Sequence, residues 1–320
     1  MYSKKIKILF VVFLATALLA VFSLWKDSVA VGKNQVVKFG IDTSDISSVK
    51  LLYNGVSTDL RRTNNVWYVN QKYKAREQSV ALMKVAFAKA ESKRPVSPEH
   101  KQKILDTLLK KGVRVEVTTS EGIKKFFIYT NPNDINSAYY AEDASKEPYI
   151  MHVPGYSNSM ANLFMMDESG WRSRELFRSS PRTLKRLQIH YPQSPENNFE
   201  IVYQSMNRFT VVGLTQIDSA RLYDYLYEYE YMNCDGYVYK DRDNILRKLS
   251  KVTPHAIIRV EDADSVKNKT LKIYMGVSGI QGIAGVVEPG NELLQFRKET
   301  LFRILVKKKY FEKNKSPLRR

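Results

Sequence analysis

The longest uninterrupted hydrophobic stretch of the chain lies close to its N-terminus. Residues 8–25 carry no charged side chain, and Lys4, Lys5 and Lys7 precede them. A helix over residues 8–25 would span about 27 Å, which is close to the thickness of a bilayer's hydrocarbon core. Since lysines favour the cytoplasmic side of a membrane span, we expect residues 1–30 to form a cytoplasmic N-terminus and a single transmembrane anchor. This predicts an inner-membrane protein that crosses the membrane once, with its main domain on the side away from the cytoplasm.

A cleaved signal peptide is the alternative interpretation of this segment. Residues 28–30, Ser-Val-Ala, resemble a cleavage site. The hydrophobic run is longer than the roughly 7–15 residues usual in signal peptides, and Lys26 and Asp27 lie where cleavage would occur. We therefore favour an uncleaved anchor, and cleavage after Ala30 stays open.

The region after the anchor combines short strand patterns with helix patterns. Asn54-Gly55 between two strand patterns is a strong hairpin signal. Ser97, Pro98 and Gly112 mark the start and the end of one helix. The sequence predicts strands over 49–53, 57–61, 66–69, 113–118, 125–130, 138–142 and 149–153, and helices over 77–91, 98–111 and 157–164.

The second half of the chain repeats this order of patterns. It predicts strands over 184–191, 199–203, 209–212, 255–261, 270–275, 286–287 and 293–296, and helices over 218–229, 241–251 and 299–306. Matching patterns lie roughly 135–150 residues apart, which favours an internal duplication over coincidence. We therefore predict an α+β protein with two similar units, 31–170 and 171–306, each an antiparallel sheet with packed helices, followed by a basic tail over 307–320.

A run of alternating tyrosines complicates the prediction of one helix. The five tyrosines from Tyr223 to Tyr231 have a period of two, which favours a strand, whereas Asp218, Leu222 and Leu226 favour a helix. We predict a helix to about Tyr229 whose tyrosines pack on a sheet. A tyrosine surface that stacks on sugar rings is the alternative.

Composition and charge narrow the classes of protein and partner. The chain has 320 residues, 43% of them hydrophobic, which excludes a wholly disordered protein. Its 51 basic and 33 acidic residues give a net charge of +18. The basic tail is either a solvated end or a contact with lipid phosphates or an acidic envelope partner. Nucleic acid is not expected as a partner, because the anchor places the basic region outside the cytoplasm. Four arginines, Arg172, Arg174, Arg178 and Arg182, are interpreted as ordinary surface charge.

The residues that usually carry chemistry do not form a recognisable motif. The histidines, His100, His152, His190 and His255, lack metal-ligand spacing, and the single cysteine, Cys234, has no basic sequence neighbour. Gly279, Gly282 and Gly285 indicate a connection between strands rather than a phosphate loop. Glu261, Asp262 and Asp264 indicate an acidic turn rather than a cation site. We therefore assign no catalytic, cofactor-binding or metal-binding residue and no cofactor.

Several short motifs occur together in the first two thirds of the chain. They are Val66–Val69, Lys72–Arg76, Pro95-Val96, Tyr149–Tyr156, Trp171–Phe177 and Tyr191-Pro192. In this combination the chain resembles the domain-of-unknown-function family numbered 4340, most closely from about Val49 to Tyr203. The resemblance implies an envelope protein of a Gram-negative bacterium with one N-terminal membrane segment. Some relatives are associated with auxiliary components of ABC-type transporters, including those linked to gliding motility, so it also implies a transporter-type partner. It implies no activity and no catalytic residues.

Together these features predict a non-enzymatic interaction protein of the envelope, an accessory to a transport or surface-assembly system. Two alternatives remain at this point. One is a module that binds an envelope polysaccharide through its tyrosines. The other is a hydrolase or transferase acting on an envelope polymer, which would need a cleft with paired carboxylates or a poised histidine.

Overall fold

The computed structural model describes residues 16, 36–145, 147–157, 159–205 and 208–313. The contacts divide the chain into unit 1, Met1–Trp171, and unit 2, Arg172–Arg320. The predicted anchor lies, apart from Thr16, outside the described residues. Within the described part of the chain, no helix combines the length and the apolar character needed to cross a membrane.

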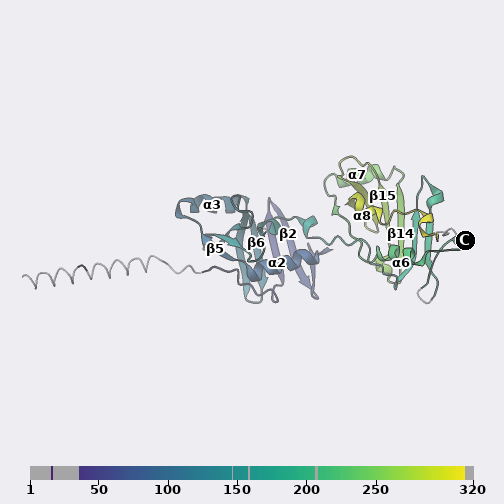
Figure 1. Ribbon diagram of the computed structural model, residues 1–320. Helices are drawn as coiled ribbons and strands as arrows, with labels where there is room; N and C mark the ends of the chain where they lie inside the picture. Colours follow the sequence, from purple (N-terminus) through teal and green to yellow (C-terminus); the bar gives the residue numbers. More distant parts are fainter. Residues whose placement is uncertain (1–15, 17–35, 146, 158, 206–207, 314–320) are drawn as a thin grey trace, which may run out of the picture. The chain divides into compact units, whose positions relative to one another are not determined.

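Unit 1 is an α+β unit with an antiparallel sheet of nine strands among its described residues (Figure 1). The strands are β1 (Ser48–Tyr53), β2 (Val56–Thr63), β3 (Val66–Val69), β4 (Tyr73–Lys74), β5 (Glu91–Pro95), β6 (Val113–Thr119), β7 (Gly122–Thr130), β8 (Ala138–Glu142) and β9 (Pro148–His152). The helices are α2 (Glu77–Lys89), α3 (Pro98–Lys111), α4 (Ala161–Phe164) and α5 (Glu168–Trp171).

Unit 2 has the same class of architecture, with an antiparallel sheet of eight strands among its described residues. The strands are β10 (Leu184–His190), β11 (Phe199–Tyr203), β12 (Phe209–Val211), β13 (Gly236–Tyr237), β14 (Ala256–Asp262), β15 (Lys269–Tyr274), β16 (Ile283–Glu288) and β17 (Glu292–Phe296). The α-helices are α6 (Ser219–Tyr227), α7 (Arg242–Leu249) and α8 (Lys298–Phe302), and the 3₁₀ helices are η1 (Pro195–Asn197), η2 (Ser265–Lys267) and η3 (Lys308–Phe311).

The two sheets have the same strand order. In unit 1 the order is β3-β2-β1-β6-β7-β8-β9-β5, with β4 added at the edge, and in unit 2 it is β12-β11-β10-β14-β15-β16-β17-β13. The register also agrees, because corresponding rows of paired residues are buried in both sheets: Val69, Leu60, Val49 and Val117 in unit 1, and Val211, Ile201, Leu187 and Val260 in unit 2. The predicted repeat of patterns thus corresponds to a shared topology, and its origin by duplication stays a prediction.

Helices cover both faces of the sheet in unit 1 (Figure 1). On one face, α2 and α4 bury Met83, Phe87 and Phe164 against the larger hydrophobic core. On the other face, α3 buries Leu108 in a smaller cluster with Tyr139 and Ile150. We call this second side the outer face. In unit 2 the corresponding helix, α7, covers a cluster around Tyr274 and Val286.

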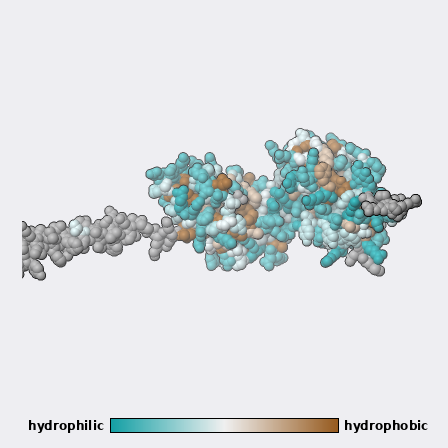
Figure 2. Space-filling view, viewed as in Figure 1, coloured by the Kyte–Doolittle hydropathy of each residue, from teal (hydrophilic) through white to brown (hydrophobic). Residues whose placement is uncertain are grey.

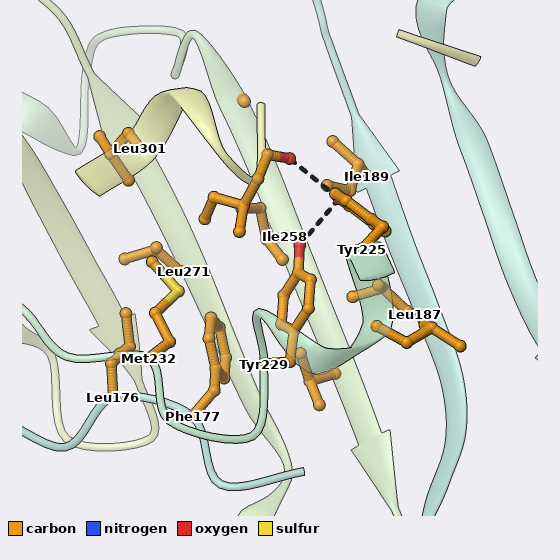
Figure 3. Close-up of a cluster of buried hydrophobic side chains, with 14 of the residues drawn as sticks. Leu176, Phe177, Leu187, Ile189, Tyr225, Tyr229, Met232, Ile258, Leu271 and Leu301 are labelled. Atoms are coloured by element: carbon orange, nitrogen blue, oxygen red, sulfur yellow. Dashed lines mark hydrogen bonds between the residues drawn. The ribbon is translucent and has the colours of Figure 1, made fainter. Parts of the chain in front are cut away.

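The alternating tyrosines are divided between the core and the surface of unit 2. A helix is present, as predicted, and the Asp218 side chain caps it by accepting a hydrogen bond from the backbone N–H of Arg221. Tyr225 and Tyr229 are buried (Figure 3), and the Tyr225 hydroxyl donates to the backbone oxygen of Ile304 at 2.9 Å. The hydroxyls of Tyr225 and Tyr229 also lie 2.9 Å apart. By contrast, Tyr227 and Tyr231 are exposed.

The interpretation of Arg172 as ordinary surface charge is wrong. Arg172 is 7% exposed and forms an ion pair with Glu292 on β17. Its guanidinium also stacks on the ring of Tyr237, 3.8 Å from the centroid. Arginine tolerates this burial because the carboxylate and the ring replace its hydration. The residue before it, Trp171, is fully buried in the core of unit 1.

The first part of the predicted basic tail belongs to the core of unit 2. Residues 308–311 form η3, and Phe311 is fully buried against Phe199 and Tyr225. The backbone oxygen of Phe311 accepts a hydrogen bond from the N–H of Asp218. The burial of this ring therefore holds the chain on unit 2 as far as residue 312. Residues 314–320 lie outside the described residues.

Candidate functional site

A groove on the outer face of unit 1 has the strongest features of a binding site. It has a cavity volume of about 570 Å³, within the range typical of ligand sites. One wall is the sheet and the other is α3. Figure 2, drawn in the same view as Figure 1, shows hydrophilic side chains over most of the visible surface around α3.

The sheet wall is a row of side chains on four neighbouring strands. Tyr129 on β7 pairs with Tyr139 on β8, which pairs with Ile150 on β9, which pairs with Arg94 on the edge strand β5. Because paired residues of an antiparallel sheet project from the same face, the row points toward α3 as a continuous strip. Two phenols, one aliphatic side chain and one guanidinium therefore line one wall of the groove.

The helix wall comes from one side of α3. His100, Lys103 and Thr107 are spaced by three and four residues and therefore share a face of the helix. Pro98 starts the helix after Ser97, whose Oγ lies 2.9 Å from Nδ1 of His100. This contact between two side chains orients the imidazole beside the groove, and it is not a helix cap, because Ser97 makes no side-chain hydrogen bond to the helix backbone.

Among the described residues, no carboxylate neutralises the positive charge of the groove. Among the described residues that line it, Arg94 and Lys103 are cationic and none is acidic. The neighbouring lysines differ, because Lys93 pairs with Asp134 at 3.1 Å and Lys101 pairs with Glu147. In the described part of the chain, Arg94 and Lys103 have no ion-pair partner. Both charges are therefore available to a ligand.

Tyr139 adds a protonated hydroxyl to the sheet wall of the groove. Burial raises the pKa of this hydroxyl above its usual value, whereas the positive charge of Arg94 and a hydrogen bond from Asn133 oppose the rise. Burial prevails, so the phenol stays a hydrogen-bond donor at neutral pH. The arrangement of cations, phenols and an amide can hold an anionic or strongly polar group.

The corresponding row of unit 2 lacks this chemistry. It runs from Tyr274 through Ala284 and Gln295 to Gly236, so that alanine and glycine stand where unit 1 has Tyr139 and Arg94. A side chain at Gly236 would meet the Gln295 amide, because a Cβ there would lie 3.2 Å from its nitrogen. The two units share a topology, but this row offers two phenols and a cation only in unit 1.

The histidines examined in the sequence lie apart from one another. His100 belongs to the groove, His152 lies on β9 and His190 on β10. His255 packs its ring against Tyr191. Within the described residues, no group of histidine, cysteine and acidic side chains has the arrangement of a metal site.

The single thiol is shielded rather than activated. Cys234 is 4% exposed, and burial raises its pKa to about 11, although the nearby charges of Arg174 and Arg172 act in the opposite direction. The sequence showed no basic neighbour, and folding supplies two. Their effect is smaller than that of burial, so the thiol stays protonated.

The glycine pattern and the acidic turn have structural roles. Gly279 and Gly282 adopt positive φ in the connection between β15 and β16, as predicted, whereas Gly285 lies inside β16. Asp262 accepts hydrogen bonds from Thr183 and from the backbone of Asp264, which accounts for the acidic turn.

The sequence did not reveal the groove. Arg94 lies in β5, which was not predicted because its residues, Glu-Ser-Lys-Arg-Pro, show no hydrophobic alternation. Tyr139 and Lys103 were predicted in a strand and a helix, but their proximity depends on tertiary pairing. The signal available in the sequence was the polar face of α3 at residues 100, 103 and 107, which by itself is typical of any exposed helix.

Comparisons with known proteins extend this description in one respect. The family model described as Domain of unknown function (DUF4340) matches residues 67–271, more than half of the chain. Neither the curated proteins nor the solved structures gave a significant match.

Proposed function

Since the chain belongs to the DUF4340 family, whose description names no activity, we propose from its own residues that it is a non-enzymatic interaction protein of the bacterial envelope. Its groove on unit 1 is the site at which it holds its partner. The observation that carries this proposal is the pair of unneutralised cations, Arg94 and Lys103, on opposite walls of a groove of about 570 Å³.

Binding fits this groove better than hydrolysis does. Hydrolysis of a glycan polymer generally requires two carboxyl groups beside the scissile bond. The described lining residues offer donors and cations instead: Arg94, Lys103, Tyr139 and Asn133. Such groups orient and retain a ligand, and Arg and Tyr are enriched where proteins bind one another.

The location of the protein is a second part of the proposal. Residues 8–25, preceded by three lysines, support a single inner-membrane anchor with units 1 and 2 in the periplasm. A partner at this position is an envelope protein, such as a component of a transport or surface-assembly system. The basic residues from Lys307 onward support a further contact with anionic lipid, at about 1 kcal/mol for each side chain close to the surface.

Co-purification of the full-length protein from native membranes tests the proposal. The groove variant, Arg94→Gln with Lys103→Gln, is compared with a control, Lys110→Gln with Lys111→Gln, which removes the same charge from the exposed end of the same helix. We expect a stoichiometric envelope protein with the unaltered chain and the control, and its loss with the groove variant. Equal recovery with all three chains would contradict the groove as the binding site.

A further inference from the structure

The groove is lined by apolar side chains as well as by charged ones. Three aliphatic side chains, Val96, Ile104 and Ile150, line the groove together with the two cations, and Ile150 pairs with Arg94 in the sheet. The cations are exposed, Val96 and Ile104 are half-buried, and Ile150 is 6% exposed in the cluster that α3 covers. The groove therefore combines an apolar lining, which we call its floor, with one cation on the sheet wall and one on α3.

This combination matches a peptide better than a free anion. A phosphate ion or a compact sugar acid would satisfy the cations but leave the exposed parts of Val96 and Ile104 in contact with water. An extended peptide presents successive side chains on alternate sides and can place an apolar side chain on the floor. Neighbouring acidic side chains then reach the cations.

The positions of the cations and phenols support the same occupant. Arg94 projects from the edge strand β5 and Lys103 from α3, so a segment lying along the groove passes between them. The Tyr139 hydroxyl and the Asn133 amide can pair with the peptide backbone, because tyrosine donates through its hydroxyl and asparagine both donates and accepts. These contacts are independent of the peptide's sequence.

From this geometry we infer that the groove binds an extended segment of a partner protein in which an apolar side chain is flanked by acidic ones. The inference rests on the proposed function and names the chemistry of the partner at that site. The charge-assisted hydrogen bonds from Arg94 and Lys103 supply specificity for the acidic residues. The floor formed by Val96, Ile104 and Ile150 selects the apolar one.

Selection from a library of random octapeptides displayed on phage tests this inference with the full-length protein in detergent micelles. We expect enrichment of sequences with an apolar residue between aspartates or glutamates. The affinity of an enriched peptide, measured by fluorescence anisotropy, should fall roughly tenfold or more with Arg94→Gln or Lys103→Gln. It should fall as salt rises and stay unchanged with Lys110→Gln.

Three results would overturn the inference. The first is an enriched consensus without acidic residues, and the second is equal enrichment of acidic peptides by the variant that lacks both cations. The third is full competition by inorganic phosphate or glucuronate at concentrations near the peptide's own, which would assign a small anion to the groove. In each case, loss of the co-purifying partner with the groove variant would still support the proposed function, so the two failures are distinguishable.

Discussion

At the scale of single residues, the least expected feature is the burial of charge where unit 2 begins. Arg172 is enclosed by Glu292 and by the ring of Tyr237, and Lys269 nearby donates to the backbone oxygen of Leu176 at 2.7 Å. Burial lowers the pKa of Lys269. Burying a charged group without its partner is unfavourable. The loss of any of these contacts should therefore lower the free energy of unfolding.

The Arg172–Glu292 pair provides the first prediction. Replacing Arg172 with Met leaves the Glu292 carboxylate, which is 27% exposed, partly desolvated and without its cation. We expect the free energy of unfolding to fall by about 2–4 kcal/mol, measured by denaturant titration. Arg303→Gln breaks a pair whose arginine is 71% exposed and should cost below about 1 kcal/mol. A similar small loss for Arg172→Met would contradict the buried pair.

The thiol of Cys234 provides the second prediction. With a pKa of about 11, roughly one thousandth of this thiol is ionised at pH 8, against about a quarter for an ordinary thiol. We expect Cys234 to react with a thiol reagent at least a hundredfold more slowly than an added cysteine at the exposed position Ser57. The raised pKa also makes stability depend on pH. The contribution of the protonated thiol to the free energy of unfolding is fully present below about pH 8.5 and is lost as the pH rises toward 11. Comparable labelling rates would show that Cys234 is accessible.

At the scale of elements, the sequence predicts most strands and helices but not their pairing. Strands such as β11 and β3 follow clear patterns, and Asp218 and Ser97 mark helix starts at the observed positions. The polar edge strand β5 escapes prediction, because a strand without a hydrophobic face looks like a loop. The groove cannot be predicted either, because Arg94 comes to lie beside Ile150 only when β5 pairs with β9.

Comparison of equivalent strands gives the third prediction. Tyr140 on β8 is fully buried, whereas Gly285 stands at the corresponding position of β16. A Cβ at Gly285 would lie 2.6 Å from the Phe296 ring and 3.0 Å from Leu271. We therefore expect Gly285→Ala to reduce the free energy of unfolding by about 1–3 kcal/mol.

A second substitution distinguishes overpacking from other causes of that loss. Adding Phe296→Leu removes the ring that the new methyl group meets. We expect the double variant to be less destabilised than the two single losses added together, as shown by a double-mutant cycle of denaturant titrations. Simple additivity would show that the ring of Phe296 is not what excludes a side chain at Gly285.

At the scale of the whole molecule, each unit has hydrophobic cores made from its own residues. The larger core of unit 1 runs from Phe39 to Trp171, and that of unit 2 from Leu176 to Phe311. Because, among the described residues, each of these cores is formed by side chains of its own unit, we expect residues 36–171 to fold when produced alone. Near-ultraviolet circular dichroism and a single cooperative thermal transition are the measurements. A chain with secondary structure but no cooperative transition would show that unit 1 depends on unit 2.

The proposed function places the envelope partner in the groove on unit 1. Photo-crosslinking in intact cells tests it most directly, with a photoreactive amino acid at Thr107, which lines the groove, or at Leu109, which is exposed on α3 outside it. We predict a discrete cross-linked envelope protein from position 107 that disappears when Arg94 and Lys103 are both replaced by Gln, and none from position 109. The same product from both positions, or from position 107 despite the two replacements, would contradict the account.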